Sequence, residues 1–221
     1  MVFAVETFTS IERNTGMKPM FFENIERDMT EEERYLQRHV HHTVELGHGT
    51  KLGRFCVIDK NVKIGAHCFI GHNTVIRENV VLRDWVTIGH NVVIETNTVI
   101  KDGTTIQSNS HITKNAEIGE YVYTGPSICM INENHIAAFG RAEQNLEGPV
   151  IKDFVRIGAR ALIMPGVEVG ENAVVGAGCL LNKNVPEKEI WFGHPAVHHG
   201  RIREDEVLNE ERIREWFINK G

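Results

Sequence analysis

The fold is indicated by a stretch that begins at Leu46 and reads LGHGTKLGRFCVIDKNVKIGAHCFIGHNTVIRENVVL as far as Leu82. A large aliphatic residue returns at every sixth position, and the series continues to Met130. Its members are Leu46, Leu52, Ile58, Ile64, Ile70, Ile76, Leu82, Ile88, Ile94, Ile100, Ile106, Ile112, Ile118, Thr124 and Met130. Two residues before each of these stands a small or β-branched residue, such as Cys56 or Val62. This six-residue period is typical of a parallel β-helix.

The period also says where each side chain lies. Three six-residue faces make one triangular coil, so residues eighteen positions apart stack along the axis. The aliphatic residue fills the interior, and its neighbours in the coils above and below shield it from water. Gly and Asn are frequent after the aliphatic residue, where the chain turns and positive φ angles are needed.

The series is interrupted once. It resumes at Ile151 and continues through Ile157, Ile163, Val169, Val175 and Leu181. From Met130 to Ile151 the chain advances 21 residues where an unbroken register needs six, so fifteen residues are inserted. The inserted loop lies within residues 132–149. A long loop on a rigid scaffold is a common location for functional residues.

The remaining segments predict a β-helix with decorated ends. We expect an N-terminal extension and capping helix over residues 1–39, with the capping-box pattern at Thr30 followed by three Glu residues. The β-helix, of about seven coils, is expected over residues 40–200 with the loop at 132–149. A C-terminal helix is expected over residues 201–221, with its helical pattern running from Glu204 to Lys220.

Composition narrows the class of function. The formal net charge is −6, which argues against a nucleic-acid partner or an anionic membrane surface. The sequence has no run of eighteen apolar residues, and Glu6 interrupts the N-terminal apolar residues early, so we expect a cytoplasmic protein. Three of the four cysteines (Cys56, Cys68 and Cys179) occupy small inward positions, and none has CxxC spacing. We therefore expect no metal site.

Several motifs carry a closer resemblance. They are Ile106-Gln107-Ser108-Asn109, Gly125-Pro126-Ser127, Met130-Ile131-Asn132-Glu133, the run GVEVGENAVVGAGCLLNKNVP at 166–186, and Gly193-His194-Pro195-Ala196. With these motifs the sequence resembles the left-handed β-helix acyltransferases over about residues 40–200, and most closely the nucleotide-sugar N-acetyltransferases. His194 replaces the Asn usual in that family, Ile131 replaces a Thr, and His135-Ile136 stands where a Pro-Arg pair is expected. The resemblance implies a left-handed coil, a homotrimer with active sites between subunits, and acetyl-CoA as co-substrate.

Acyl transfer requires a base, a group that holds the acceptor, and a donor for the tetrahedral oxyanion. The resemblance implies His135 of the loop as the base, with Asn132 and Glu133 positioning the sugar or orienting that histidine. The resemblance also implies His90 as a second candidate base, because it stands in an Ile-Gly-His-Asn turn and such a turn carries the base in some related acyltransferases. His72, eighteen residues earlier, has the same surroundings. Proton removal without a protein base is a further alternative.

The resemblance also assigns binding residues. Gln107, Asn109 and His111 would bind the acceptor, an amino-sugar carried on UDP or dTDP. Gly158, Ala159, Ala177 and Gly178 would line the path of the CoA pantetheine arm. Lys183 and Arg201 would meet CoA phosphates. Turn formation by Asn109 and ordinary surface exposure of Lys183 and Arg201 are the alternatives.

Two other functions stay open. His67 and His72 have the spacing of the paired zinc ligands in the γ-type carbonic anhydrases, which share the fold, although the position expected for a third ligand holds Glu31. The β-helix could also serve as a non-enzymatic assembly platform. The loop at 132–149 and the motifs of the late repeats favour an enzyme.

Overall fold

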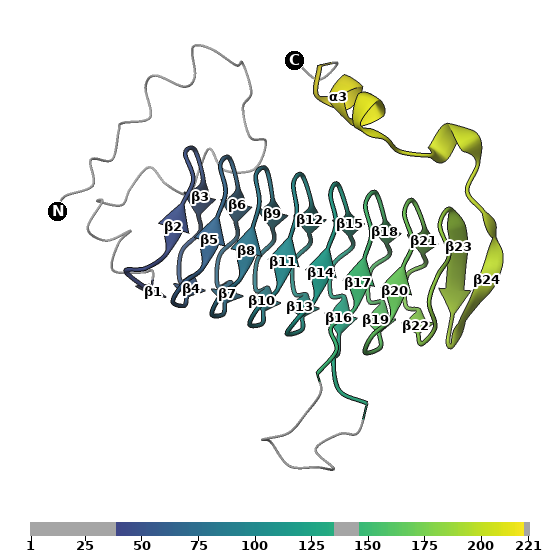
Figure 1. Ribbon diagram of the computed structural model, residues 1–221, viewed down its shortest axis with the longest axis horizontal. Helices are drawn as coiled ribbons and strands as arrows, with labels where there is room; N and C mark the ends of the chain where they lie inside the picture. The colour runs from purple at the N-terminus through teal and green to yellow at the C-terminus, as the bar shows by residue number, and fades with distance from the viewer. Residues whose placement is uncertain (1–38, 135–145, 219–221) are drawn as a thin grey trace.

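A computed structural model describes residues 39–134 and 146–218 (Figure 1). The chain winds as a triangular solenoid whose three faces are parallel sheets, which confirms the expected β-helix fold class. Face A contains eight strands, β1 (His39–Val40), β4 (Val57–Ile58), β7 (Val75–Ile76), β10 (Val93–Ile94), β13 (His111–Ile112), β16 (Cys129–Met130), β19 (Leu162–Ile163) and β22 (Leu180–Leu181). This is one coil more than the sequence predicts.

The other two faces follow the same register. Face B contains β2 (Glu45–Leu46), β5 (Lys63–Ile64), β8 (Val81–Leu82), β11 (Val99–Ile100), β14 (Glu117–Ile118), β17 (Val150–Ile151) and β20 (Glu168–Val169). Face C contains β3 (Lys51–Leu52), β6 (Phe69–Ile70), β9 (Thr87–Ile88), β12 (Thr105–Ile106), β15 (Tyr123–Thr124), β18 (Arg156–Ile157), β21 (Val174–Val175), β23 (Glu189–Gly193) and β24 (Ala196–Arg201). From β4 to β22 the second residue of each two-residue strand is buried, so the aliphatic series forms the core, whereas Val40 and Leu46 at the first coil are exposed.

Burial explains why the series tolerates so little change. Ile58, Ile76, Ile94 and Ile112 are 0 % exposed and stack along face A. Each fully buried Ile contributes roughly 1.5–3 kcal/mol to folding. Polar residues at the small inward positions satisfy their hydroxyl groups locally, as when Thr104 Oγ1 donates to the Gly119 carbonyl at 2.7 Å.

The interruption leaves the register intact. Before and after the insertion, neighbouring strands from β1 to β22 pair residues eighteen apart. The three strand pairs that span it join residues 33 apart, which is eighteen plus the fifteen inserted: Glu117 with Val150, Tyr123 with Arg156 and Cys129 with Leu162. The chain leaves the solenoid after β16 and re-enters at β17, so the loop projects from the edge between faces A and B (Figure 1). The insertion of fifteen residues predicted from the sequence has therefore been accommodated at one corner.

The C-terminal segment differs from its prediction. Strands β23 and β24 form an antiparallel hairpin, with a turn at the cis His194–Pro195 bond. A 3-10 turn, η1 (Glu204–Glu206), follows, and the α-helix α3 (Glu210–Ile218) begins six residues later than Glu204. Asn209 accounts for this start, because its Oδ1 accepts the backbone N–H of Arg212 and caps the helix. The expected N-terminal capping helix lies outside the described residues.

The segment before α3 is pinned to the solenoid by one side chain. Asn172 is 0 % exposed, and it donates to the Leu208 carbonyl at 3.0 Å and accepts the Leu208 N–H at 2.7 Å. Within the described residues, no helix combines the length and apolar character needed to cross a membrane.

Candidate active site

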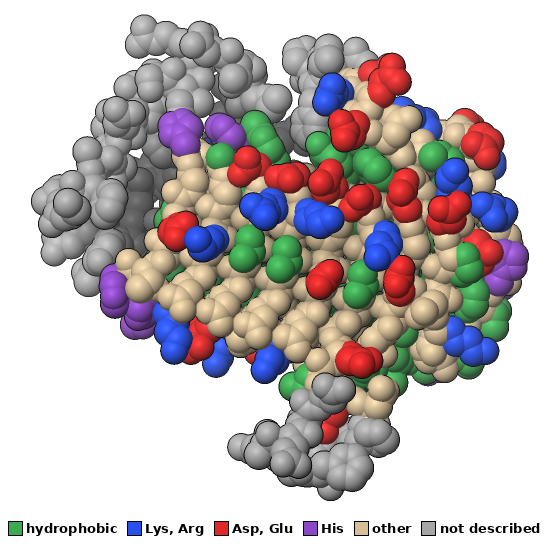
Figure 2. Space-filling view, viewed as in Figure 1, with side chains coloured by type: hydrophobic (Ala, Val, Ile, Leu, Met, Phe, Trp, Pro, Cys, Tyr) green, Lys and Arg blue, Asp and Glu red, His purple; other side chains and the backbone are tan. Residues whose placement is uncertain are grey.

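The three edges of the solenoid differ in charge. Edge CA, where the chain passes from face C to face A, consists of Gly53–Phe55, Gly71–Asn73, Gly89–Asn91, Gln107–Asn109, Gly125–Ser127, Gly158–Arg160 and Gly176–Gly178. None of these described positions holds Asp or Glu. Edge BC, between faces B and C, carries a column of carboxylates, Asp84, Asp102, Glu120, Asp153 and Glu171. Figure 2, with face B toward the viewer, shows acidic side chains in a row along its upper border. A polyanionic ligand is therefore favoured at edge CA.

The faces of the solenoid also differ in charge, and face A is the less charged of faces A and B. Its outward side chains in the central and late coils are uncharged: Val57, Val75, Val93, His111, Cys129, Leu162 and Leu180. Face B instead carries ion pairs, including Lys63 with Glu45 at 3.1 Å and Lys152 with Glu168 at 3.4 Å. Burial raises the pKa of the Cys129 thiol, so this cysteine stays protonated at neutral pH and is a poor nucleophile. His111 lies in β13 between Val93 and Cys129.

Along edge CA, two histidines form a hydrogen-bonded ladder. The backbone N–H of Arg54 donates to His72 Nδ1 at 2.7 Å, and that of His72 donates to His90 Nδ1 at 2.8 Å. The two imidazole rings stack with centroids 5.0 Å apart and planes within 6°. The backbone N–H of His90 donates in turn to Ser108 Oγ at 2.9 Å. A neutral imidazole that accepts at Nδ1 carries its proton on Nε2, so this atom is a donor in both histidines.

The next coil of edge CA places Gln107 and Asn109 directly beyond His90. Gln107 stands at a corner position that is glycine in the other described coils of this edge. Its carbonyl accepts from Ser110 Oγ at 2.7 Å, which fixes the turn. Asn109 Oδ1 accepts from Asn91 Nδ2 at 3.2 Å, so the amide nitrogen of Asn109 is left as a donor. The structure therefore places His90, Gln107 and Asn109 on two successive coils of edge CA, and we call these three residues, each with an N–H in its side chain, the donor row.

The stem of the inserted loop lies at edge AB, on the other side of face A. Asn132 Nδ2 donates to the Lys114 carbonyl at 3.4 Å, and the Asn132 carbonyl accepts the Glu147 N–H at 3.2 Å. Asn115 Nδ2 donates to the Leu146 carbonyl at 2.9 Å. Glu133 belongs to the same stem, whereas His135 lies outside the described residues. The stem thus has a fixed position, and Asn132 and Glu133 are separated from the donor row by face A.

The ladder that holds the stem runs along edge AB. Asn61, Asn79, Asn97 and Asn115 are hydrogen-bonded in sequence, each amide nitrogen donating to the next amide oxygen. These residues have φ angles near 60°, a conformation that Asn adopts more readily than most residues. A side chain at Gly148 would place its Cβ only 2.2 Å from the Asn115 carbonyl oxygen, so the returning chain passes close to this ladder.

The residues expected to bind CoA are divided between edges. Gly158, Ala159, Ala177 and Gly178 lie on edge CA, in the two coils after Ser127. Lys183 follows β22 and lies on edge AB, whereas Arg201 ends β24 and is paired in register with Glu189. A single chain therefore does not bring Lys183 and Arg201 to the small residues of edge CA.

Two features of edge CA were missed in the sequence. Arg160 stands where other coils have Asn73, Asn91, Asn109, Ser127 or Gly178, and its φ of 59° is left-handed. Holding such a residue there costs of order 1 kcal/mol or more. At the C-terminal end of the edge, Phe192 stacks on His199 with centroids 3.3 Å apart, and its Cβ lies 2.4 Å from where Gly176 would carry one. Comparing column members would have identified Arg160 as the exception.

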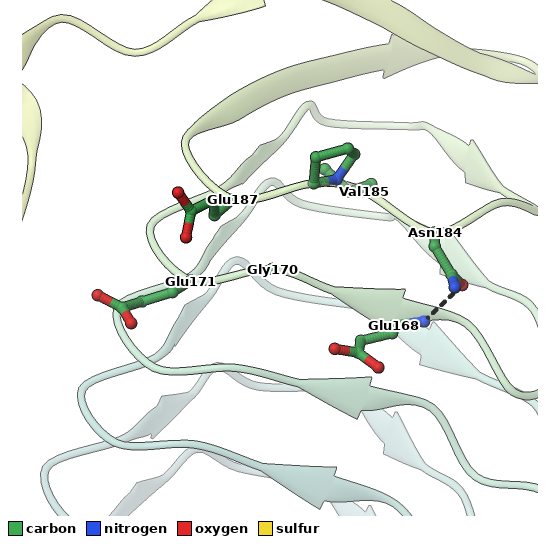
Figure 3. A pocket seen from close by; sticks show the side chains of 7 residues that line it. Glu168, Gly170, Glu171, Asn184, Val185 and Glu187 are labelled. Atoms are coloured by element: carbon green, nitrogen blue, oxygen red, sulfur yellow. Dashed lines mark hydrogen bonds between the residues drawn. The ribbon is translucent and has the colours of Figure 1, made fainter.

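A hollow of about 450 Å³ lies elsewhere, at the last coil (Figure 3). Glu168, Glu171 and Glu187 line it together with Asn184, whose Oδ1 accepts the Glu168 N–H at 2.9 Å. The carboxylates of Glu171 and Glu187 point to the same side in Figure 3. Three carboxylates repel an anionic substrate, so this hollow is not the expected CoA or nucleotide site.

The two histidines of the zinc hypothesis lie apart in the described part of the chain. His67 and His72 lie at opposite ends of β6, on edges BC and CA, and His67 stacks on Trp85 with centroids 4.3 Å apart. Among the described residues, no three His, Cys, Asp or Glu side chains come together in a way that could hold a metal ion.

The hexapeptide repeats are the part of the chain that matches a known protein family. The family model for the bacterial transferase hexapeptide (six repeats) matches residues 43–78, 61–96 and 148–183. A parallel β-helix of hexapeptide repeats is thus the class to which the fold belongs. These three segments of the chain are therefore similar to the bacterial transferase hexapeptide.

Among curated proteins, the galactoside O-acetyltransferase of Lactococcus lactis is 29% identical over 92 residues, which cover 40% of this chain and 44% of that protein. The mitochondrial gamma carbonic anhydrase 2 of Arabidopsis thaliana is 29% identical over 76 residues, covering 34% and 27%. The chain therefore spans less than half the length of these relatives. A solved structure of AntD, an N-acyltransferase from Bacillus cereus in complex with dTDP and Coenzyme A, covers 79% of this chain and 94% of AntD, with 18% identity and a TM-score of 0.49.

Proposed function

We propose that the protein is an acyl-CoA-dependent acyltransferase that acetylates an amino-sugar carried on a nucleotide, UDP or dTDP. The observation that carries this proposal is edge CA. It combines a row of donors at His90, Gln107 and Asn109 with a stripe of small residues at Gly158, Ala159, Ala177 and Gly178, and no described position on it is acidic. Both proposed substrates are polyanions with many hydrogen-bond acceptors, which suits this edge in a chain of net charge −6.

The family and its relatives support the class of reaction. The repeats are those of a transferase family, and the Lactococcus relative is a galactoside O-acetyltransferase. The choice of an amino group on a nucleotide-linked sugar is supported by the Ile106-Gln107-Ser108-Asn109 and Gly125-Pro126-Ser127 turns. These turns occupy successive coils of edge CA.

We propose different parts for the two candidate histidines. The acceptor amine would attack the thioester carbonyl carbon, the C–S bond would break, and the proton lost by nitrogen would reach the CoA sulfur. A protein base can hold that proton between these events, or the substrate itself can deliver it to the sulfur. His90 carries its own proton on Nε2 while Nδ1 accepts from His72, so it suits a donor to the acceptor or to the developing oxyanion. His135 of the loop is the proposed base.

We further propose that the active form is a homotrimer. The loop stem with Asn132 and Glu133 lies at edge AB and the donor row at edge CA, so a second copy is a direct way to bring a loop to the donor row. The uncharged outward side of face A suits such a contact, since charged residues are depleted at interface cores. A cytoplasmic location is part of this proposal.

The proposal is tested with purified protein, acetyl-CoA and a panel of UDP- and dTDP-linked amino-sugars. Release of free CoA is followed with a thiol reagent, and the acetylated product is identified by mass spectrometry. Light scattering should give about three times the 25.0-kDa chain mass. If no panel member releases CoA and acetyl-CoA at millimolar concentration does not raise the Tm, an assembly platform replaces the enzyme. Stoichiometric zinc with hydration of carbon dioxide would favour the carbonic anhydrase alternative.

A further inference from the structure

Arg160 departs from the pattern of its column in a way that core packing does not require. Other described coils place Asn, Ser, Gly or Phe at this left-handed position of edge CA. The Arg160 backbone N–H donates to the Pro126 carbonyl at 2.9 Å, so the regular turn holds it in this conformation. Its side chain is exposed and forms no ion pair with any described carboxylate. An unfavourable backbone conformation retained for an arginine points to a use for its guanidinium.

The surroundings of Arg160 leave that guanidinium accessible. Gly178 follows it in the column, and a Cβ at Gly178 would meet no atom within 4 Å. Its neighbours Ala159 and Ala177 are also small. Several cations elsewhere pair with carboxylates, as Lys60 does with Glu78 at 3.4 Å and Arg77 with Asp59 at 3.1 Å. The open space beside Arg160 is therefore available to an anion from solution.

Phosphate is the anion that fits best. A planar guanidinium forms two parallel hydrogen bonds with phosphate. The negative charge of a phosphate monoanion or dianion also compensates the positive charge of the arginine. Arg160 lies two coils beyond Asn109, and coils are spaced by roughly 4.8 Å, so about 10 Å of axis separates it from the donor row. Both the diphosphate of a nucleotide-sugar and the phosphates of CoA share the required chemistry.

We propose that Arg160 binds a phosphate group of one of the two substrates, a role that rests on the acyltransferase function proposed above. It is a binding residue for the reaction and was not predicted from the motifs. Arg160→Asn provides the main test, because Asn already occupies this column at residues 73, 91 and 109 and suits the left-handed backbone. The variant should fold with an unchanged or slightly higher Tm while it loses the phosphate contact.

The experiment measures the dissociation constants of CoA and of UDP and dTDP by calorimetry for wild type, Arg160→Asn and Arg160→Lys. One ligand class should bind roughly tenfold more weakly to Arg160→Asn, a change of about 1.4 kcal/mol, and the affected class identifies the source of the phosphate. The affinity of Arg160→Lys should lie between those of the wild type and Arg160→Asn, since Lys keeps the charge but cannot form two parallel hydrogen bonds with a phosphate. Arg83→Asn, an exposed arginine of edge BC, is the matched control and should bind both as wild type does.

The outcomes separate this inference from the proposed function. If the wild type transfers acetyl groups and Arg160→Asn binds both ligand classes within twofold of wild type, the phosphate role is overturned and the acyltransferase stands. A wild type that binds neither CoA nor a nucleotide overturns both. Should Arg160→Asn fail to fold, Arg160→Lys binding as tightly as wild type would also exclude a bidentate phosphate contact.

Discussion

His90 Nδ1 accepts a hydrogen bond from the backbone N–H of His72 at 2.8 Å. This contact links two successive coils and places the His90 proton on Nε2, the nitrogen that does not join the ladder. For His90 to act as a base through Nε2, the proton would have to move to Nδ1 and the contact with His72 would be lost. The ladder therefore favours a donor, and this gives the two histidines distinguishable mutant behaviour.

Replacing His90 with glutamine should largely preserve turnover. The Gln amide oxygen can accept the His72 N–H while its nitrogen donates to the substrate, so we expect kcat within about tenfold of wild type. His90→Ala, which removes the donor, should lower kcat by roughly 10²-fold, as loss of one oxyanion donor does. Steady-state kinetics with acetyl-CoA checks both. Equal losses in the two variants would point to a base instead.

The loop histidine should behave differently. We expect His135→Ala to lower kcat by about 10²-fold or more and to leave CoA affinity unchanged, because a general base contributes on this scale to the chemical step. Steady-state kinetics and calorimetric titration with CoA check the two parts of this prediction. Turnover near the wild-type value would indicate proton removal without this residue.

The loop stem offers a test of positioning. Gly148→Ala would place a Cβ 2.2 Å from the Asn115 carbonyl oxygen, so the returning chain must shift away from the ladder. Because the coils on either side keep their cores, we expect a Tm loss of only a few degrees, and kcat should fall tenfold or more as the loop is misplaced. Gly65→Ala serves as the control, because its added Cβ would lie 2.6 Å from the Arg83 carbonyl carbon, a comparable clash on edge BC away from the loop stem. Equal effects on kcat in both variants would contradict the positioning role.

Edge BC predicts a pH-dependent stability. Partial burial, then the neighbouring carboxylates of Asp153 and Asp102, raises the pKa of Glu120. A raised pKa in the folded state means that the fold binds this proton more tightly than the unfolded chain, so ionisation of Glu120 destabilises the fold at neutral pH. Glu120→Gln should therefore raise the Tm at pH 7 by on the order of 1 °C, since exposed charges contribute little.

The stabilisation should shrink as the pH falls through the raised pKa, because wild-type Glu120 then becomes neutral as well. Calorimetric scans of both proteins between neutral and acidic pH check this. A difference in Tm that grows toward acidic pH would contradict the assignment. Lys101, which lowers the pKa of the same carboxyl, does not change the sign.

The sequence predicted the interior of the fold residue by residue. The inward positions from Ile58 to Leu181 follow from a six-residue step, because the triangular coil places a large residue, most often Ile or Leu, at one inward position and a smaller one at the other. The loop at edge AB was equally predictable, since fifteen extra residues break the step once. The hairpin of β23 and β24 was not predicted, because the end of the solenoid has no next coil to impose the period.

The candidate site was predicted only in part, and for a physical reason. A period of six gives the place of a residue within its hexapeptide. Which of the three edges it lies on follows only from counting in steps of eighteen. Lys183 illustrates the difference, because it lies one six-residue step after Ala177 and therefore stands on the next edge, which it shares with Lys60 and Lys114. The role proposed for His135 stays a prediction, since that residue lies outside the described residues.

The loop begins and ends at one corner, and Ile118 and Ile151 pair in the same register as residues of coils without an insertion. Evolution can therefore lengthen, shorten or exchange this segment without disturbing the coils on either side. The residues of the loop can therefore change, and substrate specificity with them, while the residues of the scaffold stay the same. Transplanting residues 132–149 onto another hexapeptide scaffold at the same corner should be tolerated, which makes the loop a portable unit for engineering.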